Sequence, residues 1–151
     1  TDKTDFCVGV AGYPEKHYEA PNMAMDLFYL KKKIEMGAEY IVTQMFFNNK
    51  KFFDFCEKCR EMNINVPIIP GIKPLTTKKQ LTLLPREFFI EVPEEFTNAI
   101  MKAPDANAVQ QLGIEWCVHQ CKELIKYGVP CLHFYTMGRS EPTKKIAMQI
   151  F

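Results

Sequence analysis

Apolar residues along this chain fall into two kinds of pattern, short continuous runs and longer stretches with helical spacing. The continuous runs cover residues 6–11, 39–47, 66–72 and 129–136. They are rich in β-branched and aromatic residues and alternate little with polar ones, which is typical of parallel strands covered on both faces. The pattern therefore predicts four strands, and the prolines in the last two suit strand ends.

Between these runs, apolar residues recur every three or four positions, which is the spacing of a helix with one buried face. The first such stretch opens at Pro21 and Asn22 and ends at Gly37, a residue type that commonly caps helices. Further helices are predicted over residues 48–62, 76–84, 107–126 and 141–151, with another that starts at Glu94.

The order of these elements predicts an α/β fold of parallel βα repeats with right-handed crossovers. Four βα units are compatible with a small open sheet or with half of an eight-stranded barrel. A doubly wound dinucleotide-binding fold is disfavoured, because residues 8–12 (Val-Gly-Val-Ala-Gly) lack the GxGxxG spacing.

Composition excludes several classes of protein. The chain has 151 residues, 47% of them hydrophobic and 25% charged, and a net charge of +1. This balance is ordinary for a globular domain and gives no general attraction to nucleic acid or to a membrane surface. No apolar run approaches the roughly 20 residues of a membrane-spanning helix, and the polar first five residues do not resemble a secretory signal. We therefore expect a cytoplasmic protein.

Six cysteines raise the question of a zinc site. Cys56 and Cys59 form a CxxC inside a helical pattern, and no second CxxC or HxxxH follows at zinc-finger spacing. The remaining cysteines lie on the long helix or in strand-like runs: Cys117, Cys121, Cys7 and Cys131. We predict that all six are small buried hydrophobic residues of a reducing compartment and that the chain holds no metal.

Polar and aromatic residues follow each predicted strand, at the edge where α/β barrels hold their active sites. They are Tyr13, Glu15, His17 and Glu19 after the first strand, Thr43 and Gln44 at the second, Lys73 after the third, and Tyr135, Thr136 and Arg139 after the fourth. The set contains no Ser–His–Asp or Cys–His arrangement and no strand-end pair of carboxylates like the catalytic pair of a glycosidase. It favours a site that holds a planar, polar ligand whose own atoms react.

Several segments together resemble one enzyme family. They are Ala11-Gly-Tyr-Pro-Glu-x-His17 with Glu19-Ala20, the helix with Asp26, Leu30 and Lys33, Gly37-Ala38, Thr43-Gln44-x-Phe-Phe47, Pro67-Ile-Ile-Pro-Gly-Ile72, and Leu132-His-Phe-Tyr-Thr136 with Arg139. In this order and at this spacing they resemble the methylenetetrahydrofolate reductase family, over nearly the whole chain.

The resemblance implies an FAD-binding (β/α)8 TIM barrel, of which residues 1–151 are the second half, strands five to eight. In that family FAD takes a hydride from NADPH or NADH and reduces 5,10-methylenetetrahydrofolate to 5-methyltetrahydrofolate, in one-carbon metabolism that feeds methionine synthesis. The resemblance thus makes this chain a partial catalytic barrel. We expect its N-terminal half and any regulatory domain to lie outside the 151 residues.

The same resemblance assigns individual residues to the two ligands. The FAD-binding residues are Tyr13, His17, Ala20, Asp26 and Lys33, and the folate-binding residues are Gln44, Tyr135 and Arg139. Asp26 suits a ribose hydroxyl and Lys33 a phosphate, and the two share a helix face with Tyr29. The amide of Gln44 suits the pterin, and the guanidinium of Arg139 suits the carboxylates of the glutamate tail.

Four positions depart from the family pattern. Tyr18 stands where a proline is common, and Tyr29 stands where bacterial relatives often have a smaller polar residue. Met137 and Gly138 replace a common Leu-Asn before Arg139, and glycine there loosens the loop.

The family's general acid, a Glu on the first barrel strand, and an Asp near the flavin have no counterpart in these residues. We therefore expect this chain alone to be inactive and to pair with the other half barrel or with a second copy, because its outer strands would otherwise have open edges. The alternative is a non-catalytic half barrel that binds FAD or folate or serves only in assembly.

Overall fold

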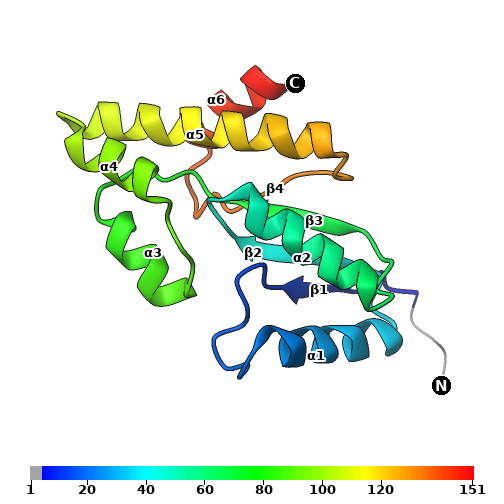
Figure 1. The fold of residues 1–151 in the computed structure, drawn as a ribbon. Helices are drawn as coiled ribbons and strands as arrows, with labels where there is room; N and C mark the ends of the chain where they lie inside the picture. Colours follow the sequence, from blue (N-terminus) through cyan, green and yellow to red (C-terminus); the bar gives the residue numbers. More distant parts are fainter. Residues whose placement is uncertain (1–4) are drawn as a thin grey trace.

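The computed structural model describes residues 5–151, and its centre is a parallel sheet of four strands in the order β1-β2-β3-β4. The strands are β1 (Gly9–Gly12), β2 (Tyr40–Met45), β3 (Ile68–Ile72) and β4 (His133–Phe134). Every neighbouring pair is parallel, so their carboxyl ends meet at one edge of the sheet, at the left in Figure 1. The predicted α/β fold of parallel βα repeats is therefore confirmed.

Six helices connect or follow the strands in residues 5–151. They are α1 (Met23–Glu35), α2 (Asn49–Glu61), α3 (Gln80–Phe88), α4 (Glu94–Lys102), α5 (Ala106–Tyr127) and α6 (Glu141–Ile150). Asn22, Asn48 and Asp105 each accept a backbone N–H at the start of a helix, as favoured N-cap residues do. Gly128 ends α5 with a φ of 94°, a left-handed conformation that glycine adopts without strain.

The main hydrophobic core lies between the sheet and the helices α1, α2 and α5, which cover one face of it (Figure 1). Along β2, Ile41, Thr43 and Met45 are buried, whereas Val42 and Gln44 on the opposite face are partly exposed. Helices on one face and an open opposite face are the arrangement of a barrel segment, in which the second face lines the interior. The structure thus fits the predicted half of a (β/α)8 barrel.

A second core joins α3 and α4 to α5, beyond the carboxyl ends of the strands (Figure 1). Phe96 stacks on Trp116 with ring centroids 4.4 Å apart, and the Trp116 indole N–H donates to the Phe47 carbonyl at 3.0 Å. These contacts fix the extra helices against the end of β2. They explain why the elaboration after β3 lies at the same edge as the predicted site.

The observed strands are shorter than the predicted ones. Phe6 and Val8 are exposed and lie before β1, although the Val8 carbonyl accepts the Glu39 N–H at 2.8 Å. Only two residues of the predicted strand 129–136 belong to β4. β4 is an outer strand, and Pro130 in the segment before it has no N–H to donate. Cys7 and Cys131 lie outside strands and are exposed, so their predicted burial is wrong, whereas the other four cysteines are buried as expected.

Helix α3 differs most from its predicted bounds of residues 76–84. Its first regular residue is Gln80, because the Gln80 side chain accepts the backbone N–H groups of Thr76 and Thr77 and holds them in a preceding turn. The helix then continues through Pro85 to Phe88 and ends at Phe89, which has a φ of 55°. The sequence prediction ended this helix at Leu84, before Pro85. Proline lacks an N–H and restricts the backbone, but the helix tolerates it near its C-terminal end.

Candidate functional site

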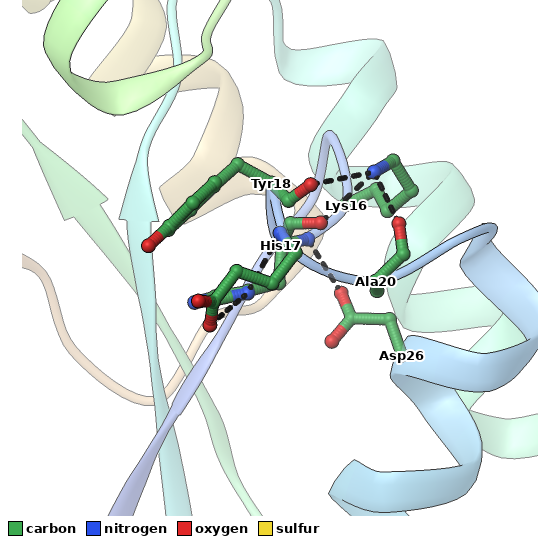
Figure 2. A network of polar contacts seen from close by, with 6 residues as sticks. Lys16, His17, Tyr18, Ala20 and Asp26 are labelled. Carbon is green, nitrogen blue, oxygen red and sulfur yellow. Dashed lines mark hydrogen bonds and ion pairs between the residues drawn. The ribbon is translucent and has the colours of Figure 1, made fainter.

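The loop after β1 is closed by the ammonium group of Lys16, which binds carbonyls of the loop itself (Figure 2). Its Nζ donates to the carbonyl of His17 at 3.0 Å and to that of Ala20 at 2.6 Å. The backbone of Lys16 has a φ of 77° and its N–H donates to the Tyr13 carbonyl at 3.1 Å. A residue other than glycine rarely adopts this backbone conformation. The ammonium contacts of Lys16 therefore stabilise a strained turn.

Asp26, near the start of α1, holds the same loop from below. Its Oδ2 accepts the backbone N–H of His17 at 2.8 Å (Figure 2). The His17 ring packs edge-on against Tyr13, with ring centroids 4.6 Å apart. Burial raises the pKa of the Tyr13 phenol, and the nearby Asp26 carboxylate raises it further. The structure therefore brings Tyr13, His17, Ala20 and Asp26 together in one loop and its supporting helix.

Lys33 lies on the same helix but does not join this cluster. It is exposed, about 10 Å along the helix axis from Asp26, given the rise of an α-helix. Among residues 5–151 its ammonium group forms no ion pair. Tyr29 between them is also exposed. The helix face shared by Asp26, Tyr29 and Lys33 is thus an open surface beyond Asp26, with the ammonium group of Lys33 at its far end.

Two contacts outside the prediction fasten the loop to the segment after α3. The Tyr18 ring stacks on Phe89 with centroids 4.9 Å apart, and Glu15 accepts the backbone N–H of Glu91 at 3.1 Å. Lys51 of α2 binds the Glu91 carboxylate at 3.1 Å. Burial raises the pKa of the Glu15 carboxyl. Tyr18, where the family commonly has a proline, therefore has an aromatic partner in Phe89.

At the end of β2, Gln44 and Thr43 take different roles. Gln44 is partly exposed and its amide oxygen accepts the backbone N–H of Met45 at 2.9 Å. Thr43 is buried, and its carbonyl accepts the Tyr135 hydroxyl at 2.9 Å. Tyr135 reaches across β3 because Gly71 leaves room: a Cβ there would lie 2.6 Å from the Tyr135 ring and 2.2 Å from the Thr43 carbonyl oxygen.

A pocket of about 570 Å³ lies between the loop after β4, the segment after β3 and α3. Tyr135 and Arg139 are both in its wall, together with Gln80 and Leu84 of α3, whereas Gln44 does not line this pocket. Burial raises the pKa of Tyr135, and the Tyr13 phenol adds to this rise, so the two predicted groups are neighbours. The volume is in the range of small-molecule pockets.

Lys73, directly after β3, is a pocket residue to which the sequence assigned no ligand. Only 7% of it is exposed, yet it lies in the wall of this pocket. Burial lowers the pKa of its ammonium group, and the charge of Arg139 lowers it further. Its position at a strand end was the available signal, but burial of a lysine cannot be foreseen from one sequence.

Comparison with known proteins now identifies the family. The profile of the methylenetetrahydrofolate reductase family matches residues 1–151, which is the whole chain. The chain belongs to the methylenetetrahydrofolate reductase family. It is 37% identical over 143 residues to a probable methylenetetrahydrofolate reductase (NADPH) of Caenorhabditis elegans, covering 93% of this chain and 22% of that protein. It is 36% identical over 155 residues to methylenetetrahydrofolate reductase (NADH) 1 of Arabidopsis thaliana, covering 96% and 26%.

The chain thus spans about a quarter of the length of these two reductases. Among solved structures, it is similar to an uncharacterised protein from Clostridium thermocellum that binds two copies of 5-methyl-5,6,7,8-tetrahydrofolic acid. The TM-score is 0.61 at 22% identity, over 96% of this chain and 52% of that one. At this identity the likeness concerns the fold alone. The parallel βα units of this chain are consistent with that likeness. Within residues 5–151 of this family member, no helix is both long and apolar enough to cross a membrane.

Proposed function

We propose that this chain supplies flavin and folate contacts to a reductase that converts 5,10-methylenetetrahydrofolate to 5-methyltetrahydrofolate with NADPH or NADH. Membership of the family supports the reaction, and the relatives named for NADPH and for NADH leave both nicotinamides as donors. The observation that carries the proposal is the pocket that holds Tyr135 and Arg139 at the carboxyl edge, next to the loop with Tyr13 and His17.

The residues at the loop after β1 fit a flavin dinucleotide in their chemistry. Tyr13 and His17 offer ring surfaces, and Asp26 uses Oδ2 for the loop, leaving its second oxygen for a ribose hydroxyl. Lys33 offers an ammonium group without an ion pair among residues 5–151, which suits a diphosphate. Bound FAD would supply the hydride-transfer chemistry that no side chain has. In this proposal Asp26 also holds the loop in place.

On the folate side, the proposal gives three residues separate tasks. Arg139, whose guanidinium makes no ion pair among residues 5–151, binds carboxylate of the glutamate tail. Tyr135 contributes its ring, because its hydroxyl already donates to Thr43. Gln44 would bind the pterin edge with the amide N–H groups that its contact with Met45 leaves free.

A general acid is the part that these side chains do not provide. Glu15 already accepts a backbone N–H from Glu91, and Glu87 in the pocket wall is paired with Arg86 at 2.7 Å. We infer that the acid comes from a second half barrel, which would also pair with the open edges of β1 and β4. In this proposal the 151 residues alone bind ligand and do not reduce it.

The experiment is a titration of the purified chain with FAD, followed by quenching of flavin fluorescence. The test variant is Asp26→Ala/Lys33→Ala. The matched control is Lys31→Ala/Glu35→Ala, which removes one cation and one carboxylate from the same helix, an ion pair at 4.0 Å. We expect saturable binding that the test variant weakens about tenfold or more and the control leaves unchanged, since each lost contact is charged. A chain with native circular dichroism that does not bind FAD would contradict the flavin assignment.

A further inference from the structure

The pocket beside Arg139 has more positive charge than one substrate carboxylate requires. Lys73 and Lys79 also line it, and Glu87, the acidic residue among its described lining residues, is paired with Arg86. Neither Lys73 nor Arg139 forms an ion pair among residues 5–151. The wall is therefore cationic, and the charges of Lys73 and Arg139 are without an ion-pair partner in the part of the chain that the structure describes.

Lys73 is the more informative of these two. It is 7% exposed, and its Nζ has one contact, at 3.5 Å, with the carbonyl oxygen of Pro74. A buried ammonium group without an anion is costly to the fold, and a carbonyl at that distance compensates little of the cost. Such a group is unusual unless something outside the described residues neutralises it.

Thr143 supplies a second unsatisfied group in the same wall. Its Oγ1 is buried and has no hydrogen-bond partner in residues 5–151. Thr143 belongs to the first turn of α6, where Ser140 makes no side-chain cap. The first N–H groups of a helix have no partner within it and form its positive end. The start of α6 therefore offers the pocket the Thr143 hydroxyl and the N–H groups of its first turn, except at Pro142, which has none, and Glu141 is the acidic residue of this turn.

We propose that Lys73, Thr143 and the first turn of α6 form an anion subsite beside Arg139, which binds the carboxylates of the substrate's glutamate tail. An ammonium group, a hydroxyl and a helix N-terminus all favour a negative group at one place. The inference rests on the proposed function for the identity of the ligand. Lys73 and Thr143 are residues that the proposed function did not use.

The place of this subsite favours a tail rather than a ring. Tyr135 offers an aromatic surface in the same pocket, and Arg139 follows it in the loop after β4. A ligand with its ring at Tyr135 would extend its acidic end past Arg139 toward α6. Phosphate is the other anion that such a barrel edge commonly binds, so a phosphate probe belongs in the test.

The test measures binding of three ligands to the full 151-residue chain by calorimetry. They are 5-methyltetrahydropteroate without a tail, 5-methyltetrahydrofolate with three γ-glutamates, and the tri-γ-glutamate peptide alone. We expect Lys73→Met to weaken the triglutamate about tenfold or more and the tail-free ligand less than about twofold, because only the tail loses a charged contact. Thr143→Val should have a smaller effect of the same kind. Lys144→Met, at an exposed position on α6, is the control of equal charge and should change neither affinity.

A thermal melt separates a binding role from a structural one. Methionine removes the unpaired buried charge, so Lys73→Met should melt at or above the temperature of the unaltered chain. If this variant melts lower and loses all ligands equally, Lys73 supports the fold and the proposal is wrong. Equal affinity of the unaltered chain for the tailed and tail-free ligands would also refute the subsite, while leaving the folate function intact.

The opposite pattern distinguishes the two proposals. If the peptide alone binds and Lys73→Met abolishes its binding, while the pteroate does not bind, the subsite stands and the folate function fails. Adenosine 2′,5′-bisphosphate is the phosphate probe. If it binds in a Lys73-dependent manner and the tail does not, the anion is a phosphate and the assignment to carboxylates is overturned.

Discussion

Gly113→Ala tests the close approach of α5 to the backbone of the segment after β3. Gly113 lies in α5 where the helix passes the backbone of Leu75, in the segment that carries Lys73 to the pocket. A Cβ at this position would lie 1.7 Å from the Leu75 carbonyl oxygen and 2.9 Å from its carbonyl carbon. Real Cβ atoms are essentially never found closer than 3.0 Å to such atoms. Because the obstacle is backbone, the helix and the segment must separate by more than about 1 Å.

Two effects of opposite sign decide the magnitude. In an unobstructed helix, alanine in place of glycine would stabilise by about 1 kcal/mol. Here the separation also loosens Val109 in one core and Ile114 and Cys117 in the other, all on α5. Overpacking of this kind costs about 1–3 kcal/mol and sometimes more. Since backbone cannot yield as a flexible side chain can, we expect a net loss of about 2–3 kcal/mol in the free energy of unfolding.

The assay is urea unfolding followed by circular dichroism, with folate binding measured in parallel. His119→Ala, at an exposed position in the middle of α5, is the control and should be neutral or slightly stabilising. Displacing the segment before Leu75 should also weaken folate binding in the Gly113 variant, because Lys73 moves with it. If Gly113→Ala unfolds at the same or a higher urea concentration than the unaltered chain, the close approach of α5 to Leu75 is wrong.

Three further predictions concern the loop, the pocket and the thiols. Lys16→Met removes the ammonium contacts but keeps the strained φ of 77°, so amide exchange in the loop after β1 should accelerate about tenfold. Lys16→Gly removes the strain as well and should exchange more slowly than the methionine variant; the reverse order would contradict the role of the ammonium. Tyr135→Phe leaves a buried carbonyl without its donor and should cost about 1 kcal/mol in urea unfolding, whereas Tyr127→Phe, at an exposed ring, should cost nothing measurable. Burial raises the pKa of Cys59 and of Cys121 from 9.0 to about 12. The folded state therefore favours the neutral thiol over the thiolate at both residues. This contribution is complete below pH 9 and is lost as the pH rises toward about 12, so the urea midpoint should fall over that window and fall less in Cys121→Ala.

Sequence reasoning predicted most of the fold because local and tertiary signals agree in it. The apolar stripe of α1 and its N-cap Asn22 are both local, and the helix forms where they indicate. The prediction failed where pairing decides the outcome. β4 pairs with β3 over two residues, and α3 begins late because the Gln80 side chain accepts the N–H groups of the preceding turn. Neither fact is encoded by spacing alone.

The site was predicted by strand ends and family resemblance, which locate residues but not their partners. Tyr135 and Arg139 share a pocket, as expected from the parallel sheet. Asp26 was assigned to a ribose, and the structure uses one of its oxygens to hold the loop backbone. Lys73 and Thr143 carried no assignment, because their significance lies in burial and in missing partners, which exist only once α6 packs beside the strand ends.

Local strain in this chain concentrates at the edge where ligands are proposed to bind. Of the non-glycine residues with positive φ in residues 5–151, Lys16, Phe89 and Met137 lie at the carboxyl edge, and Asn63 lies after α2. Each such residue costs about 1 kcal/mol or more unless its surroundings compensate. Lys16 is held by its own ammonium contacts, and Phe89 by its stack on Tyr18. The unpaired charge of Lys73 adds a further cost at the same edge. A fold selected for stability alone would relieve these costs, so their concentration at one edge agrees with the proposal that this edge binds a ligand.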